Sequence, residues 1–403
     1  MSGPEITVRF ELPKRVSQIL YHTLSLLENH FYLQLKEHPQ GNVLISDSAE
    51  ADIRISQKFI EAIINRQFDQ HLLMHKQPVI LSSDGAPDLL GTCAYMVNFL
   101  QEYDDNPDHF DHLLRFKYEK SYQHRFDCIT ENLVLRYLLQ LQEECSKLQD
   151  LERKKLPSQL WVSHDIDYLY HNRIPDLKTA IRHFSLKEVF QVISKTFQDP
   201  DEEIFDKILS INQANGLQAT FFWLASKRTY MSEHEGPIEN ANYSIHSPKV
   251  RMLMQKITSA GFELGVHQSL GCRDLVSEKN SIDPGISINR NHYLAGKLPE
   301  LWRSLDQANI PRDASAGFSN AMGFRNSYGW PVQPFDLQRQ QPFKVTEYPL
   351  HIMDATFLNL HLGPHETFSQ ITSFLDNHSS DCQLSLLWHN NYFSEIKFKE
   401  WIE

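Results

Sequence analysis

The chain has 403 residues, more than one typical hydrophobic core holds, so two domains are predicted. Hydrophobic residues make up 41% and charged residues 22%, as in ordinary globular proteins. The net charge of −12 argues against a general nucleic-acid binder and against docking on an anionic membrane. The sequence shows no apolar stretch of membrane-spanning length and no signal-peptide pattern, so we expect a cytoplasmic protein.

Cysteine and histidine usage narrows the kinds of site to expect. The five cysteines are widely spaced and form no Cys-x-x-Cys pair. This favours a reducing compartment and excludes a thiolate zinc finger. The 20 histidines make a metal site of histidine and aspartate ligands possible.

Residues 1–155 are predicted to form a smaller accessory domain of mixed α/β structure. The expected elements are helices at 16–31, 88–103 and 130–148 and a short strand at 78–81. No metal-ligand or nucleophile pattern stands out among them. The polar segment 146–157, which ends at Pro157, marks the boundary.

Residues 156–403 alternate between strands and helices, a pattern typical of a parallel α/β sheet or barrel. The expected strands lie at 160–167, 218–224, 262–266, 286–290, 313–318, 323–325, 347–350 and 384–388. The expected helices lie at 201–215, 247–260 and 298–308, with Gly216 and Gly261 ending the first two. A variable loop is expected between the first strand and the first helix.

Polar side chains stand at the ends of several predicted strands. Asp165 and Asp167 lie two residues apart, so they face the same side of an extended chain, where a cation or a shared proton would relieve their repulsion. The other strand-end residues are His267, Arg290, His292 and His389. Each alone has a structural explanation, such as an Asp-rich turn or a packed histidine. Together, at one rim of a parallel sheet, they suit a metal site for hydrolysis.

The second region resembles the polysaccharide deacetylase family, carbohydrate esterase family 4, over residues 156–395. The matching segments are Ser163-His164-Asp165-Ile166-Asp167, Ala219-Thr220-Phe221-Phe222, Gly261 to Ser269, Arg290-Asn291-His292-Tyr293 and Leu387-Trp388-His389. The resemblance implies a distorted (β/α) barrel of seven strands.

One subgroup of that family matches best, and in it an accessory domain of unknown role precedes the barrel. The barrel segments that fit this subgroup are Gly323-Phe324-Arg325 and Pro334-Phe335-Asp336-Leu337. The residues that look like recurring marks of its accessory domain are Asp88, Glu102-Tyr103 and Arg115-Phe116.

The resemblance also implies a role for each site residue. Asp165 would be the catalytic base, oriented by Arg290, and His389 would protonate the leaving group. Asp167 and His267 would bind a divalent metal, with zinc expected first and cobalt, nickel or iron as alternatives. The two aspartates are one residue further apart than in the family, so their roles could be exchanged.

One family ligand is missing from the sequence. The second histidine ligand lies four residues after the first, a position that is Gly271 here. Because an open catalytic site usually has three protein ligands, we expect a third from elsewhere. Our candidate is His292, two residues after Arg290 and therefore on the same side of an extended segment. The alternative is that His292 only packs as an aromatic ring, with His351, His361 or water completing the site.

These observations predict a metal-dependent hydrolase that removes an acetyl or other acyl group from a sugar amide or ester. The expected substrate is a carbohydrate or sugar conjugate, such as a nucleotide- or lipid-linked precursor in the cytosol. The alternative is a catalytically silent barrel used for carbohydrate binding or assembly. Gly271 favours this alternative, whereas the presence of Asp165, Arg290 and His389 together favours the enzyme.

Overall fold

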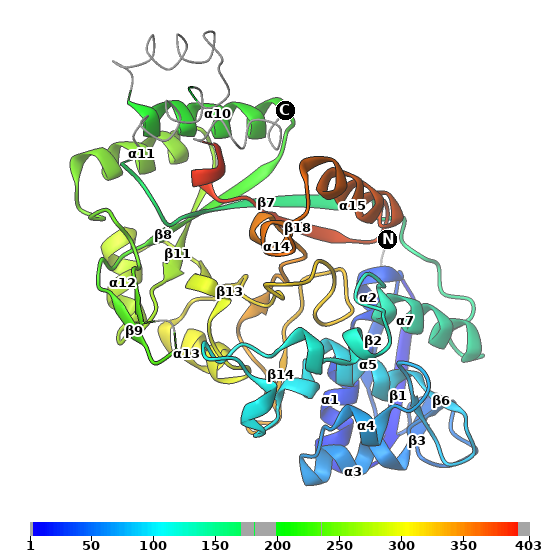
Figure 1. Ribbon diagram of the computed structural model, residues 1–403. Helices are drawn as coiled ribbons and strands as arrows, with labels where there is room; N and C mark the ends of the chain where they lie inside the picture. Colours follow the sequence, from blue (N-terminus) through cyan, green and yellow to red (C-terminus); the bar gives the residue numbers. More distant parts are fainter. Residues whose placement is uncertain (1–2, 171–180, 182–198, 235, 394–403) are drawn as a thin grey trace.

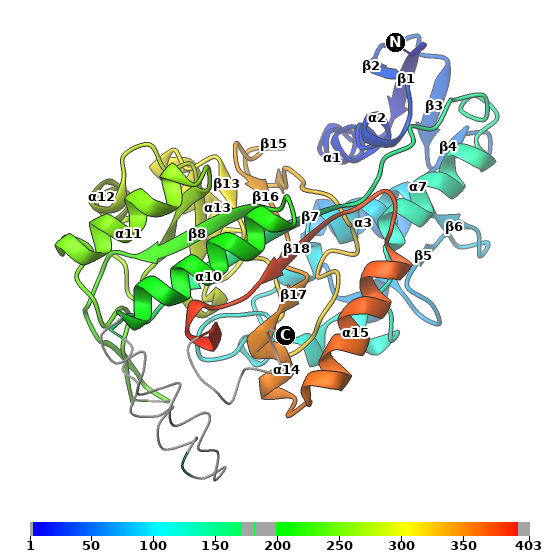
Figure 2. The same ribbon diagram turned by 90° about the horizontal axis from the view of Figure 1, so that it is seen from above.

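Two parallel β-sheets organise the computed structural model, which describes residues 3–170, 181, 199–234 and 236–393 (Figure 1). The smaller sheet belongs to the N-terminal part of the chain, and the larger one contains strands from residue 159 onward. In both ribbon views the N-terminal part lies to one side of the large sheet (Figures 1 and 2). Each of the two parts of the chain therefore contains a parallel sheet together with helices.

The N-terminal part is built on a four-stranded parallel sheet that the sequence analysis did not predict. Its strands, in the order β2-β1-β3-β4, are β2 (Gln34–Glu37), β1 (Glu5–Glu11), β3 (Val43–Ser46) and β4 (Ile53–Arg54). Ile6 and Val8 alternate with more exposed residues along β1 and enter the core. The helices beside this sheet are α1 (Lys14–Leu24), α2 (Leu27–His30), α3 (Gln57–Asn65), α4 (Gln70–Leu73), α5 (Leu89–Val97), α6 (Tyr122–Arg125) and α7 (Leu133–Glu144).

The three predicted N-terminal helices are confirmed, with shorter bounds. Segment 16–31 divides into α1 and α2, and segment 88–103 becomes α5 followed by the 3-10 turn η1 (Leu100–Glu102). The predicted strand at 78–81 is β5 (Ile80–Leu81), which pairs with β6 (Pro87–Asp88). Two further 3-10 turns are η2 (Pro107–His109) and η3 (Tyr118–Lys120).

The large sheet has eight strands, and every neighbouring pair is parallel. In spatial order they are β16 (Thr346–Glu347), β13 (Arg312–Asp313), β12 (Ile288–Asn291), β11 (Glu263–Gln268), β8 (Gln218–Leu224), β7 (Gln159–Ile166), β18 (Gln383–Leu387) and β17 (Ile352–Met353). The expected count of seven strands is therefore not confirmed. The additional edge strand β17 is only two residues long, so no apolar run in the sequence could indicate it.

The large sheet is curled into a half-barrel. Its two edge strands, β16 and β17, are consecutive in the chain, and Glu347 and Ile352 are separated by so few residues that they lie within about 18 Å. In a flat sheet of eight strands the two edges would be about 34 Å apart. The short connection therefore requires strong curvature, which fits the (β/α) barrel class that the sequence predicted.

Helices connect the strands, as expected for parallel pairing. They are α10 (Pro200–Ala214), α11 (Pro248–Ser259), α12 (Leu275–Ile282), α13 (Glu300–Ala308), α14 (Asp354–Asn359) and α15 (Pro364–Asn377). Gly216 and Gly261 follow α10 and α11 with positive φ, as predicted for helix ends. Most of the expected variable loop before α10 lies outside the described residues. Within the described part of the chain, no helix combines the length and apolarity needed to cross a bilayer.

The remaining elements are short and lie in the connections. They are the hairpins β9 (Tyr230–Ser232) with β10 (Gly236–Ile238) and β14 (Phe335–Asp336) with β15 (Gln341–Pro342), and the 3-10 turns η4 (His292–Leu294) and η5 (Asn390–Phe393).

The predicted strand at 323–325 is wrong, because this segment is an irregular loop packed against the N-terminal part. The backbone N–H of Phe324 donates to the carbonyl of Ile129 at 2.8 Å, which takes the place of a strand partner. Gly323 has φ +134°, and a Cβ there would lie 2.4 Å from the Ile129 carbonyl oxygen. The guanidinium of Arg325 makes a bidentate, buried ion pair with Glu102, at 2.8 and 2.6 Å.

The hydrophobic core of the N-terminal part also takes residues from this distant loop. Four buried side chains after residue 327 belong to the same apolar cluster as β1, α1 and α5: Tyr328, Val332, Phe335 and Leu337. The two parts of the chain are thus packed together over a shared apolar surface. The predicted boundary between residues 155 and 156 stays a prediction.

Candidate active site

The six site residues predicted from the sequence lie together at the carboxyl ends of neighbouring strands. Asp165 is in β7, and Asp167 follows that strand directly. His267 in β11 and Arg290 in β12 are register partners, while His292 begins η4. His389 follows β18, which pairs with β7 on the edge away from β8. Parallel pairing thus brings residues far apart in sequence to one rim, as expected for α/β folds.

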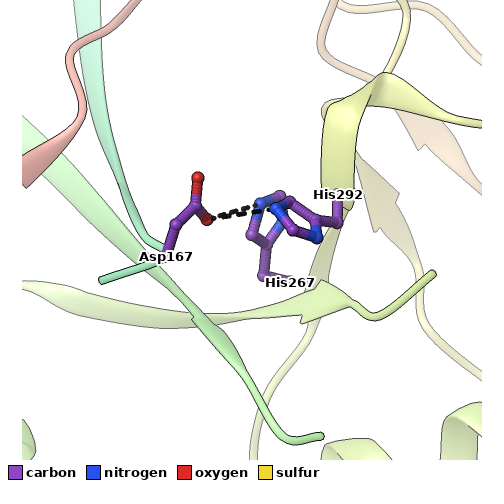
Figure 3. A group of neighbouring side chains, drawn as sticks. All are labelled: Asp167, His267 and His292. Atoms are coloured by element: carbon purple, nitrogen blue, oxygen red, sulfur yellow. Dashed lines mark ion pairs between the residues drawn. The ribbon is translucent and has the colours of Figure 1, made fainter. Parts of the chain in front are cut away.

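Asp167, His267 and His292 form a group suited to a metal ion (Figure 3). Their candidate ligand atoms all lie within 4.8 Å of one another. Oδ1 of Asp167 is 3.2 Å from Nε2 of His267 and 3.8 Å from Nε2 of His292. Tetrahedral zinc ligands stand about 3.3 Å apart, so these positions are close to a ligating arrangement. This is the one such group found in the described part of the chain.

Both histidines are oriented by hydrogen bonds from their other ring nitrogen. Nδ1 of His267 donates to the carbonyl of Arg290 at 2.8 Å. Nδ1 of His292 lies 3.2 Å from Oδ1 of Asn240. That Asn240 oxygen also accepts from the Leu270 N–H, while the Asn240 amide nitrogen donates to two carbonyls, so the oxygen faces His292. Each imidazole therefore presents Nε2 toward Asp167, the arrangement that metal-binding histidines need.

The charges of the three groups also suit a cation. Oδ1 of Asp167 is buried and meets no hydrogen-bond donor at bonding geometry among the described residues. Burial raises the pKa of Asp167, but His292 and His267 outweigh it and hold the pKa well below its usual range. Burial lowers the pKa of His292 to about 4, so its ring is neutral at neutral pH. Burial lowers the pKa of His267, but Asp165 and Asp167 outweigh it and raise that pKa.

Asp165 lies beside the triad and is held by Arg290. Nη1 of Arg290 donates to Oδ1 of Asp165 at 2.9 Å, and Oδ2 of Asp165 is 3.5 Å from Nε2 of His267. The Asp165 side chain is only 3% exposed, whereas that of Asp167 is 28% exposed. Solvent therefore reaches the site from the Asp167 side.

Arg290 is itself fixed in a fully buried position. Its Nε donates to the carbonyl of Ala314 at 2.9 Å, and its guanidinium carbon lies 4.4 Å from the ring centre of Phe222. Gly265 makes room for that ring, since a Cβ at this position would lie 2.5 Å from it. Phe222 and Gly265 are register partners on neighbouring strands. The sheet thus builds a rigid platform under the Asp165 carboxylate.

His389 lies near Oδ2 of Asp167, whereas the two other histidines lie near Oδ1. It is held by Asp354, the first residue of α14. Nδ1 of His389 contacts Oδ1 of Asp354 at 2.7 Å, and its backbone N–H donates to the other carboxylate oxygen at 2.5 Å. Nε2 of His389 lies 3.6 Å from Oδ2 of Asp167. Burial lowers the pKa of His389, but the charges of Asp354, Asp167 and Asp165 outweigh it and raise that pKa to about 10. The ring therefore carries a proton at neutral pH.

Several histidines that the sequence made available lie elsewhere. His164 alternates with Asp165 along β7, and its ring contacts the carbonyl of Trp388 and the Asn212 side chain. His351 bonds to Ser385, and His361 is exposed in the loop after α14. Neither His351 nor His361 belongs to the metal-suited group.

Two supporting residues were not predicted from the sequence. Asp354 orients His389, and Asn240 orients His292. An acidic residue at a helix start was the available signal for Asp354. For Asn240, no pattern in the sequence distinguishes it from other loop asparagines.

No protein-family model and no curated protein matches this chain.

Proposed function

We propose that the chain is a metal-dependent hydrolase that removes an acetyl or other acyl group from a sugar amide or ester. The main support is the convergence of Nε2 of His267, Nε2 of His292 and Oδ1 of Asp167, flanked by an Arg290-held carboxylate and a protonated histidine. Three protein ligands leave a position open for water or substrate, as catalytic zinc sites do. The carbohydrate substrate rests on the resemblance to polysaccharide deacetylases.

A divalent metal held by this triad would supply Lewis acidity and a water of lowered pKa. Asp165, fixed by Arg290, is placed to accept a proton from the attacking water. His389, kept protonated by Asp354, is placed to give a proton to the leaving nitrogen or oxygen. Water adds to the carbonyl, and the C–N or C–O bond breaks. Asp165 gains one proton and His389 loses one, so the overall count balances, and exchange with solvent restores both groups.

The alternative function is a silent carbohydrate-binding barrel, which Gly271 favours because the usual ligand is missing at that position. A side chain there would also be strained, since φ is +71°. His292 supports the enzyme, because it stands where a third ligand is needed.

The experiment that separates the two functions is hydrolysis by protein stripped of metal and then reloaded. The substrates are an N-acetylated amino sugar and an aryl acetate, and acetate release is measured. We expect release from protein reloaded with zinc or cobalt and none from the stripped protein. The matched control is the Asp167→Asn variant reloaded in the same way. Absence of metal-dependent release from both substrates would favour the silent barrel.

Replacement of His389 by alanine is expected to affect amides most. An amine leaves poorly unless it is protonated, so amide turnover should fall by about 10²–10⁴-fold. An aryl acetate needs little protonation and should be hydrolysed nearly as fast as by the wild type. Initial rates on both substrates provide the test, and equal losses on the two would argue against an acid role for His389.

A further inference from the structure

The candidate third ligand, His292, stands on an irregular segment. It begins η4, where the backbone leaves β12, and two non-glycine residues that follow, Tyr293 and Leu294, have φ of +59° and +55°. Such left-handed conformations are unfavourable for residues with a Cβ and persist only when the surroundings hold them. The position of the His292 ring therefore depends on whatever fixes this segment.

A loop of the N-terminal part supplies two contacts to this segment. Nη1 of Arg115 donates to the carbonyl of Tyr293 at 3.0 Å. The carbonyl of Leu113 accepts from the N–H of Gly296 at 3.0 Å. Just beyond, Nζ of Lys297 donates to the carbonyl of Asp104 at 2.6 Å. The N-terminal part thus holds the segment at the left-handed residue Tyr293 and just after Leu294.

The loop that makes these contacts, residues 110–116, is itself well organised. The carboxylate of Asp111 accepts from the N–H groups of Leu113 and Arg115, each at 2.9 Å, and from Nε of Arg115 at 2.6 Å. An antiparallel bridge between Phe110 and Phe116 closes the loop. Both rings pack in one apolar cluster with Phe318 of the barrel region. A loop fixed in this way can position its neighbours.

The segment after β11, where the family resemblance places the missing ligand, has no histidine. Its Gly271 has φ +71° and provides no side chain. Asn240 connects this segment to the metal group, because its side chain bonds both to Leu270 and to His292. The ring of His292 is therefore supported from one side by Asn240, while its backbone segment is supported by loop 110–116.

We propose that the N-terminal part completes the metal centre by positioning His292, with Arg115 as the principal positioning residue. This inference rests on the proposed function, because it assumes that the triad binds a metal. It gives residues 1–155 a role at the site although none of those that the structure describes belongs to the metal-suited group. Loss of the Arg115 contact should allow the segment to relax and should weaken only the third metal–ligand bond.

The test is zinc affinity, measured by competition with a chromophoric chelator, for wild-type protein, Arg115→Ala, His292→Ala and the double variant. Supporting residues around metal ligands typically contribute 10–100-fold to affinity, so Arg115→Ala should bind zinc about 10-fold or more weakly. In the His292→Ala background the same change should have no further effect. The visible spectrum of the cobalt-loaded Arg115→Ala protein should shift toward that of His292→Ala.

Arg136→Ala is the matched control, because Arg136 also lies in the N-terminal part and pairs with Glu131 on the surface. It should bind zinc as the wild type does. If Arg115→Ala fails to fold, Arg115→Lys provides a milder variant that keeps the charge and should show an intermediate loss.

The outcomes separate this inference from the proposed function. Wild-type affinity for the Arg115 variants, or an equal loss with and without His292, would overturn the positioning role while leaving the metal site intact. Failure of the wild-type protein itself to bind either zinc or cobalt would overturn the proposed function and this inference with it.

Discussion

Asp165→Asn is expected to lower amide turnover by about 10²–10⁴-fold, the usual contribution of general acid–base help. Asparagine keeps the shape of the side chain, and its oxygen can still accept from Nη1 of Arg290. It cannot take a proton from water. Because Asp165 lies outside the metal-suited group, zinc affinity should remain close to that of the wild type.

The same variant decides between the two aspartates. Turnover is measured on an N-acetylated amino sugar and zinc affinity on the same preparation. Turnover near that of the wild type would show that Asp165 is not the base. Loss of zinc affinity would show that Asp165 is a ligand, so that the two aspartates have exchanged the roles assigned to them.

His267→Ala and His292→Ala are expected to weaken zinc binding comparably, each by more than about 100-fold. Residues that merely support a ligand contribute 10–100-fold, and a direct ligand should contribute more. Turnover should fall with metal occupancy, because both the nucleophilic water and the polarised carbonyl depend on the metal. Isothermal titration with zinc at constant pH is the measurement.

His361→Ala is the matched control for these variants. Its side chain is exposed and lies outside the triad, although the sequence alone left it as an alternative ligand. It should bind zinc as tightly as the wild type. Wild-type affinity for His292→Ala, together with weak binding by His267→Ala, would exclude His292 as the third ligand.

Much of the large sheet could be predicted because its central strands are long apolar runs. Most residues of β7, β8, β11 and β18 are buried, and parallel strands covered on both faces have a nearly continuous hydrophobic pattern. The strands β13, β16 and β17, of which the last two form the sheet edges, are two residues long and provide no comparable signal. The false strand at 323–325 has a different cause, since the backbone N–H of Phe324 donates to Ile129 in the N-terminal part of the chain and not to a neighbouring strand.

In the small N-terminal sheet, only β1 has a strand pattern that can be recognised in the sequence. In β1, Ile6, Val8 and Phe10 alternate with polar residues, the pattern of a strand with one buried face. The three other strands have four residues or fewer. A single alternating stretch among several helical segments is a weak basis for a sheet.

Residues at strand ends could be predicted as members of the candidate site, but the contacts that support them could not. The six predicted residues could be identified because parallel strands place their carboxyl ends at one rim. Asp354 could not be assigned to His389, because that contact depends on β17 lying next to β18. Likewise, the contact between Arg115 and the Tyr293 carbonyl joins residues far apart in sequence and depends on the packing of the two parts.

The most direct test of the proposed metal centre is a crystal structure of the protein grown with zinc, with anomalous data collected above the zinc edge. We expect one strong anomalous peak per chain, from a zinc ion bonded to Nε2 of His267, Nε2 of His292 and a carboxylate oxygen of Asp167 at about 2.0–2.2 Å. Absence of a peak at this position, with zinc present in excess, would contradict this expectation.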